Sequence, residues 1–368
     1  MPVEQRSEVD TIAGLPASRI VSVINDLVDR EAEVVALLLV GSLAQGLGTP
    51  SSDIDLYVLC EHADRLSFDE IALEIDGVIV DAQVHALERT RQRLAAVTEW
   101  DGAIGGNHSL PQIPDGEREF CHRILTARVL AGDLDRVLGA GMDARLRDRL
   151  QNLKLLVASH HARSLQVDAH GAVLDNDFVL AADLAQTGLR HAFDAVAAGF
   201  GETAVNPKWR LRFLSRLVAG NCVDPGAGRI LLAEMTRGIA LEPSAETYRV
   251  GAAATAAIRA LLAAAELGFA TQAPPHFTSV ATTPVADSGM RSLRFDLDLH
   301  VSGDTVRFQS LMADYEPFDG PIDLLDHFFH SDPHGAIRPC GVMTTADADI
   351  ARGLNDWIAR HASLSLPL

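Results

Sequence analysis

The stretch that decides the fold runs from Val34 to Leu59 and reads VVALLLVGSLAQGLGTPSSDIDLYVL. It joins a short apolar run, a small-residue loop that begins with Gly41-Ser42, and a second apolar run that begins with Asp53 and Asp55. Strand side chains repeat every two residues, so both aspartates fall on one face of the second predicted strand. Two adjacent carboxylates cannot both stay ionised at low cost. The pattern therefore predicts a bound divalent cation at the start of a buried strand.

The totals favour an acidic protein of several domains. The chain has 368 residues, and its 50 Asp and Glu against 31 Lys and Arg give a formal net charge of -19. This length predicts two or three domains. The charge argues against binding to duplex nucleic acid, which needs a basic face, and favours cations as partners.

We also expect a cytoplasmic protein. No apolar stretch is expected to be long enough to span a bilayer, and the first residues lack the pattern of a signal peptide. The cysteines (Cys60, Cys121, Cys222 and Cys340) lie far apart, which favours reduced thiols over disulfides or a zinc site.

The elements around the opening stretch predict an α/β domain. Apolar spacing predicts an amphipathic helix over 18–32, followed by buried strands over 34–40 and 53–59. Another strand is predicted over 74–84 and a helix over 87–97. The strand at 74–84 carries Asp81 in a largely apolar setting, where an unpaired charge is costly. The loop at 101–116 is a plausible hinge.

The rest of the chain predicts a helical region and then a small α+β module. No strand is expected between residues 117 and 269, and helices are predicted over 118–130, 144–165, 177–198, 208–218, 226–237 and 244–267. Strict alternation over 292–301, a tight turn at 302–304 and a return over 305–311 predict an antiparallel hairpin. Short helices are expected over 322–330 and 347–360.

Four features in order carry a resemblance to a known family. They are Gly41-Ser42, an eleven-residue step, Asp53-Ile54-Asp55, and Asp81 on the next strand. This pattern resembles the nucleotidyltransferase superfamily of the DNA polymerase β type. It looks most like the aminoglycoside (kanamycin-type) nucleotidyltransferases, in which a helical domain also follows the catalytic one. The motif similarity covers roughly residues 34 to 84.

The resemblance implies a fold and a division of the chain. The expected fold class is an α/β (α+β) nucleotidyltransferase core with a mixed sheet, an all-helical domain and a small C-terminal α+β module. The expected domains are a catalytic domain over 1–115, a helical substrate-binding domain over 116–272 and the module over 273–368.

The resemblance also implies a reaction. A nucleoside monophosphate, with AMP favoured, would move from a triphosphate such as ATP to a small-molecule hydroxyl, with release of pyrophosphate. Asp53, Asp55 and Asp81 would be catalytic and would bind Mg2+, with two ions expected, because clustered carboxylates suit magnesium. Gly41 and Ser42 would contact the phosphates.

A basic and aromatic cluster adds further candidates for binding the triphosphate. Lys208 is expected to reach its phosphates, Trp209 to stack on its base, and Arg210 to contribute charge. An equally good interpretation is a helix start with one buried tryptophan. Arg123 and Arg128 are weaker candidates for the same cleft, because most helix charges are solvated.

Several alternatives stay open. The acceptor is expected to be small and is favoured to be cationic by the acidity of the chain, but a protein or peptide acceptor recognised by the C-terminal module is a second hypothesis. A third is a non-catalytic, nucleotide-binding or antitoxin-like protein, including a catalytically silent scaffold. No duplex nucleic acid and no membrane is expected as a partner, and the sequence does not give the oligomeric state.

Overall fold

The computed structural model describes residues 11–28, 32–100, 113–139, 142–239, 242–279, 297–302, 305–310, 317–322, 337–339, 352–353 and 356. The chain forms two compact units. The first contains residues 1–102, 111–150 and 203–209, and the second contains 103–110, 151–202 and 210–368. The division into three domains at residues 115 and 272 stays a prediction.

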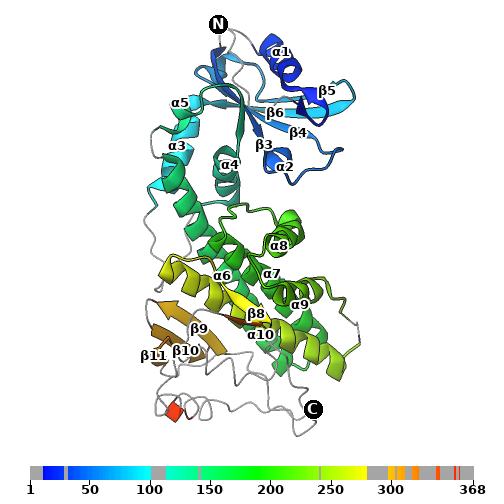
Figure 1. Ribbon diagram of the computed structural model, residues 1–368, viewed down its shortest axis with the longest axis vertical. Coiled ribbons are helices and arrows are strands. Elements are labelled where there is room, and N and C mark those ends of the chain that lie inside the picture. Colours follow the sequence, from blue (N-terminus) through cyan, green and yellow to red (C-terminus); the bar gives the residue numbers. More distant parts are fainter. Residues whose placement is uncertain are drawn as a thin grey trace. The chain divides into compact units, whose positions relative to one another are not determined.

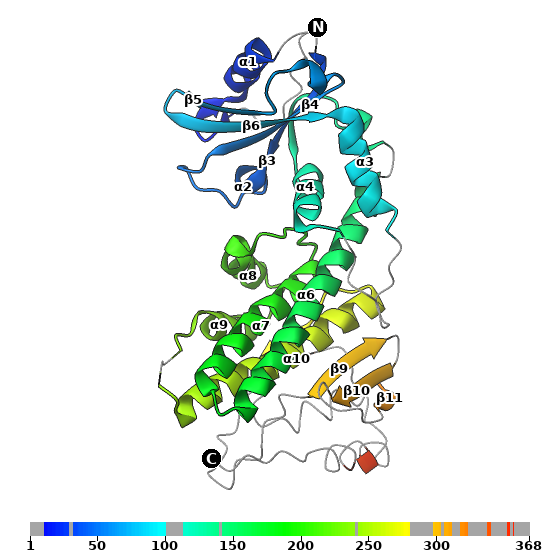
Figure 2. The same cartoon turned by 180° about the vertical axis from the view of Figure 1, so that it is seen from behind.

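A mixed five-stranded sheet forms the centre of the first unit (Figures 1 and 2). Its order is β5-β6-β4-β3-β7, with β4 and β6 parallel and the other neighbours antiparallel. The strands are β3 (Val34–Val40), β4 (Ile54–Cys60), β5 (Glu70–Ile75), β6 (Val78–Ala86) and β7 (Arg128–Gly132). The expected strands at 34–40 and 53–59 are therefore confirmed, as is a mixed sheet.

Helices cover both faces of this sheet. Helix α1 (Ala17–Leu27) packs its buried side chains against the even-numbered residues of β4 and β6, whereas α4 (Asp115–Leu125) lies on the opposite face (Figure 1). The other elements of the unit are β1 (Thr11–Ile12), β2 (Leu15–Pro16), α2 (Gly41–Ala44), η2 (Ala63–Arg65), α3 (Leu87–Thr98), α5 (Asp135–Leu138) and η3 (Pro207–Trp209).

Two local predictions in this unit are wrong. The segment predicted as one strand over 74–84 is a hairpin, because Asp76 and Gly77 both have positive φ angles (50° and 85°) and turn the chain between β5 and β6. Asp-Gly favours such a turn. The helix predicted over 118–130 ends at Leu125, and β7 follows and pairs with β3. A strand therefore does occur in the region expected to be wholly helical.

The second unit is a helical core joined to small sheets. Its helices are α6 (Met142–Leu174), within which the unit boundary falls, α7 (Phe178–Gly199), α8 (Arg210–Ala219), α9 (Pro225–Thr236) and α10 (Ala245–Thr271). Helices α7 and α10 cross closely, since a Cβ on Gly251 would lie 3.2 Å from Ala182 Cα. The helices predicted over 144–165, 177–198, 208–218, 226–237 and 244–267 are observed.

Strands after residue 272 belong to the same core. They are β8 (Phe277–Ser279), β9 (Leu297–Ser302), β10 (Thr305–Ser310), β11 (Phe318–Pro321) and β12 (Ile337–Pro339). The predicted hairpin is confirmed as β9 and β10, and four of its side chains, with that of β8, enter the helical core: Phe277, Leu299, Val301, Val306 and Phe308. The helices predicted over 322–330 and 347–360 lie almost wholly outside the described residues.

Side chains from the helices occupy the free edge of β9. The backbone N–H of Val301 donates to Glu266 Oε2 (2.9 Å), and Arg163 Nη2 donates to the carbonyl of Leu299 (3.0 Å). Arg163 also pairs with Glu266 (2.5 Å). This edge therefore has hydrogen-bond partners within the chain, which leaves less opportunity for a peptide to add to it as a further strand.

The expectation that no apolar stretch is long enough to span a bilayer is wrong. Helix residues Glu246–Thr271 are long and apolar enough to cross a bilayer by length and composition. However, 94% of the apolar window lies buried inside the protein, which is typical of a core helix in a water-soluble fold.

Candidate active site

Two carboxylates stand side by side on the face of the sheet that α4 covers. Asp55 on β4 and Asp81 on β6 are register partners in the parallel pair, so their side chains leave the sheet on the same face. Both are half-buried, and Asp53, just before β4, is exposed. The structure thus brings Asp55 and Asp81 together from segments far apart in the sequence, as the family resemblance implies.

Charged groups at four other positions influence Asp55. Burial raises the pKa of its carboxyl, and the negative charges of Asp81 and Asp53 raise it further. The positive charges of Arg123 and Lys208 oppose this rise. Arg123 Nη1 lies 3.8 Å from Asp55 Oδ1. All these residues belong to the first unit, so this unit alone supplies a cluster of three acids and two bases.

The Gly41-Ser42 turn lies against the same carboxylate. Gly41 has a φ of 69°, and a Cβ at this position would collide with the Asp55 side chain. Glycine is therefore required here by the backbone conformation and by the neighbouring acid. The carbonyl of Ser42 accepts hydrogen bonds from the N–H groups of Leu47 (2.8 Å) and Gly48 (3.0 Å), which close the loop that follows.

An aromatic cluster that the sequence did not reveal fastens α4 to the sheet. Tyr57 on β4 stacks on Phe120 of α4 at 5.4 Å between ring centroids, and His85 on β6 meets both rings edge-on at 4.5 and 5.0 Å. Arg93 of α3 lies over the Phe120 ring at 3.5 Å. These contacts fix the helix that carries Arg123, so they position its guanidinium beside Asp55.

A buried histidine links three segments of the first unit. His122 on α4 is 1% exposed, and its Nε2 lies 2.9 Å from Gln45 Nε2, directly after α2. Its Nδ1 lies 2.7 Å from the hydroxyl of Thr203. Because Thr203 begins the segment that ends with Lys208 and Trp209, this chain of hydrogen bonds fastens that segment to the domain that carries the aspartates. The sequence offered no pattern that predicts this link.

The three predicted triphosphate contacts have different surroundings. Lys208 is exposed, its Nζ lies 5.0 Å from the Trp209 ring centroid, and its charge acts on Asp55. Arg210 belongs to the second unit, where its Nε and Nη2 donate to the carboxylate of Asp194 at 2.5 to 2.9 Å. A nucleotide contact by Arg210 stays a prediction, and it would have to compete with this ion pair.

The acids provide the oxygen ligands that magnesium prefers, but they are too few to hold the ion without other ligands. Within the described part of the chain, no group of three or more His, Cys, Asp or Glu residues is placed to hold a metal by protein ligands alone. Magnesium, however, is commonly held by one or two carboxylates together with water and substrate phosphates. The adjacent oxygens of Asp55 and Asp81 fit that arrangement, with Asp53 close enough to influence Asp55.

A comparison with protein families points to the same part of the chain. A family model described as a nucleotidyltransferase domain matches residues 20–97. A solved structure, a nucleotidyltransferase-like protein from Exiguobacterium sibiricum 255-15, is similar at 11% identity and a TM-score of 0.36, over 67% of this chain and 73% of that one. A search of curated proteins found no match.

Proposed function

We propose that the protein is a metal-dependent nucleotidyltransferase that moves a nucleoside monophosphate from a triphosphate, with AMP from ATP favoured, to a hydroxyl of a small-molecule acceptor. The family match supports nucleotidyl transfer in general. The single observation that carries the finer proposal is the register pairing of Asp55 with Asp81 beside the Gly41 turn. The formal net charge of -19 favours a small acceptor that carries a cationic group, and the separated cysteines favour a cytoplasmic setting.

The carboxylates form the reactive end of the site. Asp53, Asp55 and Asp81 would hold the magnesium ions, which when bound would neutralise the triphosphate and polarise the reacting phosphoryl group. Asp81 would accept the proton of the acceptor hydroxyl. The hydroxyl oxygen bonds to the α-phosphorus while the bond to the pyrophosphate oxygen breaks, so the proton goes to the carboxylate and pyrophosphate leaves.

The remaining residues bind and orient the triphosphate. Gly41 allows close approach of the backbone, and the Ser42 hydroxyl would donate a hydrogen bond to a phosphate oxygen. The positive charges of Arg123 and Lys208 already act on the acids and would also stabilise phosphate charge. Trp209 would stack on the base.

The test uses the full chain and an unbiased search for the acceptor. The protein is incubated with each of the four ribonucleoside triphosphates, magnesium and a metabolite extract, and products are sought by mass. We expect a small metabolite that gains one nucleoside monophosphate, together with pyrophosphate. Release of pyrophosphate with the nucleoside monophosphate found on protein side chains would instead favour the peptide-acceptor alternative. Binding of ATP with no product would favour the non-catalytic alternative.

A further inference from the structure

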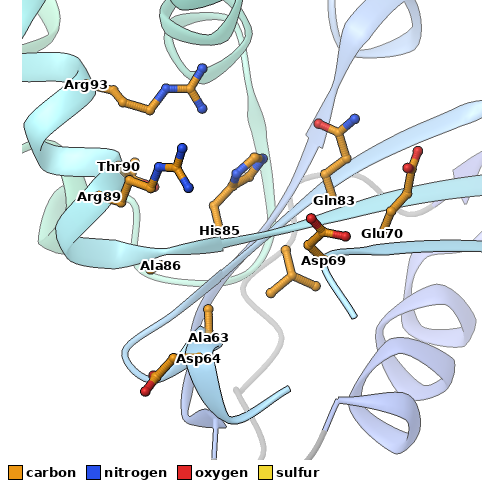
Figure 3. A pocket seen from close by; sticks show the side chains of 11 residues that line it. Ala63, Asp64, Asp69, Glu70, Gln83, His85, Ala86, Arg89, Thr90 and Arg93 are labelled. Carbon is orange, nitrogen blue, oxygen red and sulfur yellow. The ribbon is translucent and has the colours of Figure 1, made fainter. Parts of the chain in front are cut away.

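A pocket of about 500 Å3 opens on the first unit (Figure 3). Asp53, Asp55 and Asp81 are not among the residues that line it. It is bounded by η2, the start of β5, the last part of β6 and the first turns of α3. Its lining residues are Ala63, Asp64, Asp69, Glu70, Gln83, Val84, His85, Ala86, Arg89, Thr90 and Arg93. The volume suits a small molecule.

One side of the pocket is suited to an anion. Helix α3 begins there without a side-chain cap on its first amides, because Ala86 occupies the cap position. Unsatisfied N–H groups and the helix dipole favour a negative group at such an end. Arg89 stands in the first turn and forms no ion pair with any residue that the structure describes. Arg93, by contrast, is already paired with Glu117 at 2.5 Å.

Two buried polar atoms on this side have no hydrogen-bond partner in the protein. Thr90 is fully buried, and its Oγ1 is unpartnered, as is Nε2 of His85. Such groups are costly to leave unsatisfied, and both residues line the pocket, so a ligand group that reached these atoms would supply the missing partner. Burial and the charges of Arg93 and Arg89 lower the pKa of His85 to about 4, so its ring is neutral at pH 7 and can accept or donate one hydrogen bond.

The opposite side is suited to a cation. Figure 3 shows Asp69 and Glu70 across the pocket from Arg89 and Thr90, with His85 and Gln83 between them. Asp69 and Glu70 are exposed, and neither is in a salt bridge with a described residue. The two sides therefore present opposite charges to the same space.

We propose that this pocket binds a small zwitterion, with its anionic group at the start of α3 near Arg89 and Thr90 and its ammonium group at Asp69 and Glu70. A ligand with charge of only one sign would pair with one side of the pocket and leave the charges on the other side without a partner.

The pocket also lies next to the reactive acids. Gln83, which lines it, follows Asp81 by two residues on the same face of β6, a rise of about 7 Å. The zwitterion is therefore the acceptor, and its hydroxyl end extends toward Asp81. That last step rests on the proposed function, whereas the binding site itself does not.

The test measures binding and turnover separately. Calorimetry with the full chain uses 4-aminobutyrate, 6-aminohexanoate, lysine and phosphoethanolamine as zwitterions, with inorganic phosphate and 1,4-diaminobutane as single-charge controls. We expect at least one zwitterion to bind at least tenfold more tightly than both controls. Arg89→Ala and Thr90→Val should each weaken that binding at least fivefold, whereas Glu88→Gln, an exposed neighbour that does not line the pocket, should not change it.

The outcomes separate the two proposals. If no zwitterion binds more tightly than the controls, or if both pocket variants bind as the wild type does, the pocket assignment is wrong. If Asp55→Asn retains zwitterion binding while the wild type transfers nothing to any metabolite, the proposed function fails and the pocket stands. If transfer occurs with an unchanged acceptor KM in Arg89→Ala and Thr90→Val, the function stands and the acceptor assignment is overturned.

Discussion

Asp55 and Asp81 are register partners on the parallel strands β4 and β6, and Arg123 Nη1 approaches within 3.8 Å of Asp55 Oδ1. Under the proposed function, an acidic pair with one guanidinium close by would suit a metal-bound triphosphate. The metal would take the carboxylate oxygens, and the arginine would be available for phosphate oxygens.

Replacing either acid should abolish transfer without unfolding the protein. Asp55→Asn and Asp81→Asn each keep size and hydrogen-bonding capacity but remove a negative charge, so we expect turnover to fall by about 100-fold or more. Asp26→Asn, on the exposed side of α1, is the matched control and should keep wild-type turnover. Circular dichroism and the melting temperature check the fold. Wild-type rates in both acid variants would remove these residues from the mechanism.

Lys208 gives a direct test of triphosphate contact, because the sequence contains only two lysines. Lys208 is exposed and Lys154 is 8% exposed, so an amine-acylating reagent should modify Lys208 much faster. We expect ATP with magnesium to slow modification of Lys208 about tenfold and to leave Lys154 unchanged, as measured by peptide mass spectrometry. Equal rates with and without nucleotide would contradict a role for Lys208 in binding the phosphates.

The hydrogen bond between His122 and Thr203 should position Lys208. Thr203→Val keeps the shape but leaves His122 Nδ1 without its hydroxyl partner, which should destabilise the protein by about 1–3 kcal/mol. We also expect the KM for the triphosphate to rise several-fold with little change in kcat. Thr203→Ser retains the hydroxyl and should restore both values. A stability loss with no change in KM would reduce His122 to a purely structural role.

His85 should make stability depend on pH. Its pKa is lowered from 6.5 to about 4, chiefly by burial, so between these values the unfolded chain binds a proton that the folded chain does not. The stabilising contribution is therefore complete above pH 6.5 and is lost as the pH falls toward 4. We expect this loss to be on the order of 1–3 kcal/mol. In urea titrations, His85→Gln should flatten the pH dependence, and parallel curves for the two proteins would contradict the assignment.

The strands after residue 272 should contribute to the stability of the second unit. Phe308 is fully buried in the helical core, so Phe308→Ala should lower the free energy of unfolding by about 3–5 kcal/mol. Arg307→Ala, which removes an exposed pair with Asp319, is the control and should change little. Urea unfolding measures both. If Phe308→Ala matches the control, these strands form a separable module, and truncation after Gln272 becomes a usable test of acceptor recognition.

Much of the catalytic core could be predicted from the sequence because its information is local. The apolar run over 34–40 predicts a buried strand, and the alternation of the aspartates predicts which face of the next strand carries them. Asp76-Gly77 is also a local feature, but the apolar residues on both sides of it have the pattern of one continuous strand. Strand β7 is short and follows a helix without a break, so only its pairing with β3 identifies it.

The surroundings of the acids could not be predicted in the same way. The contact of Arg123 with Asp55, the stacking of Phe120 on Tyr57, and the bond between His122 and Thr203 join residues that are distant in the sequence. No periodicity records such pairs, because they depend on how α4 packs on the sheet. The pocket beside β6 likewise forms from three separate segments.

The most direct test of the central claim traces the α-phosphate and the γ-phosphate of ATP into the products. The wild-type protein is supplied with magnesium, a metabolite extract and ATP labelled either at the α-phosphate or at the γ-phosphate, and products are separated by chromatography. We predict that the α-label appears on a small-molecule product and the γ-label in pyrophosphate, and that Asp81→Asn gives neither. Transfer of the γ-label to the product, or undiminished α-label transfer by Asp81→Asn, would contradict nucleotidyl transfer at these aspartates.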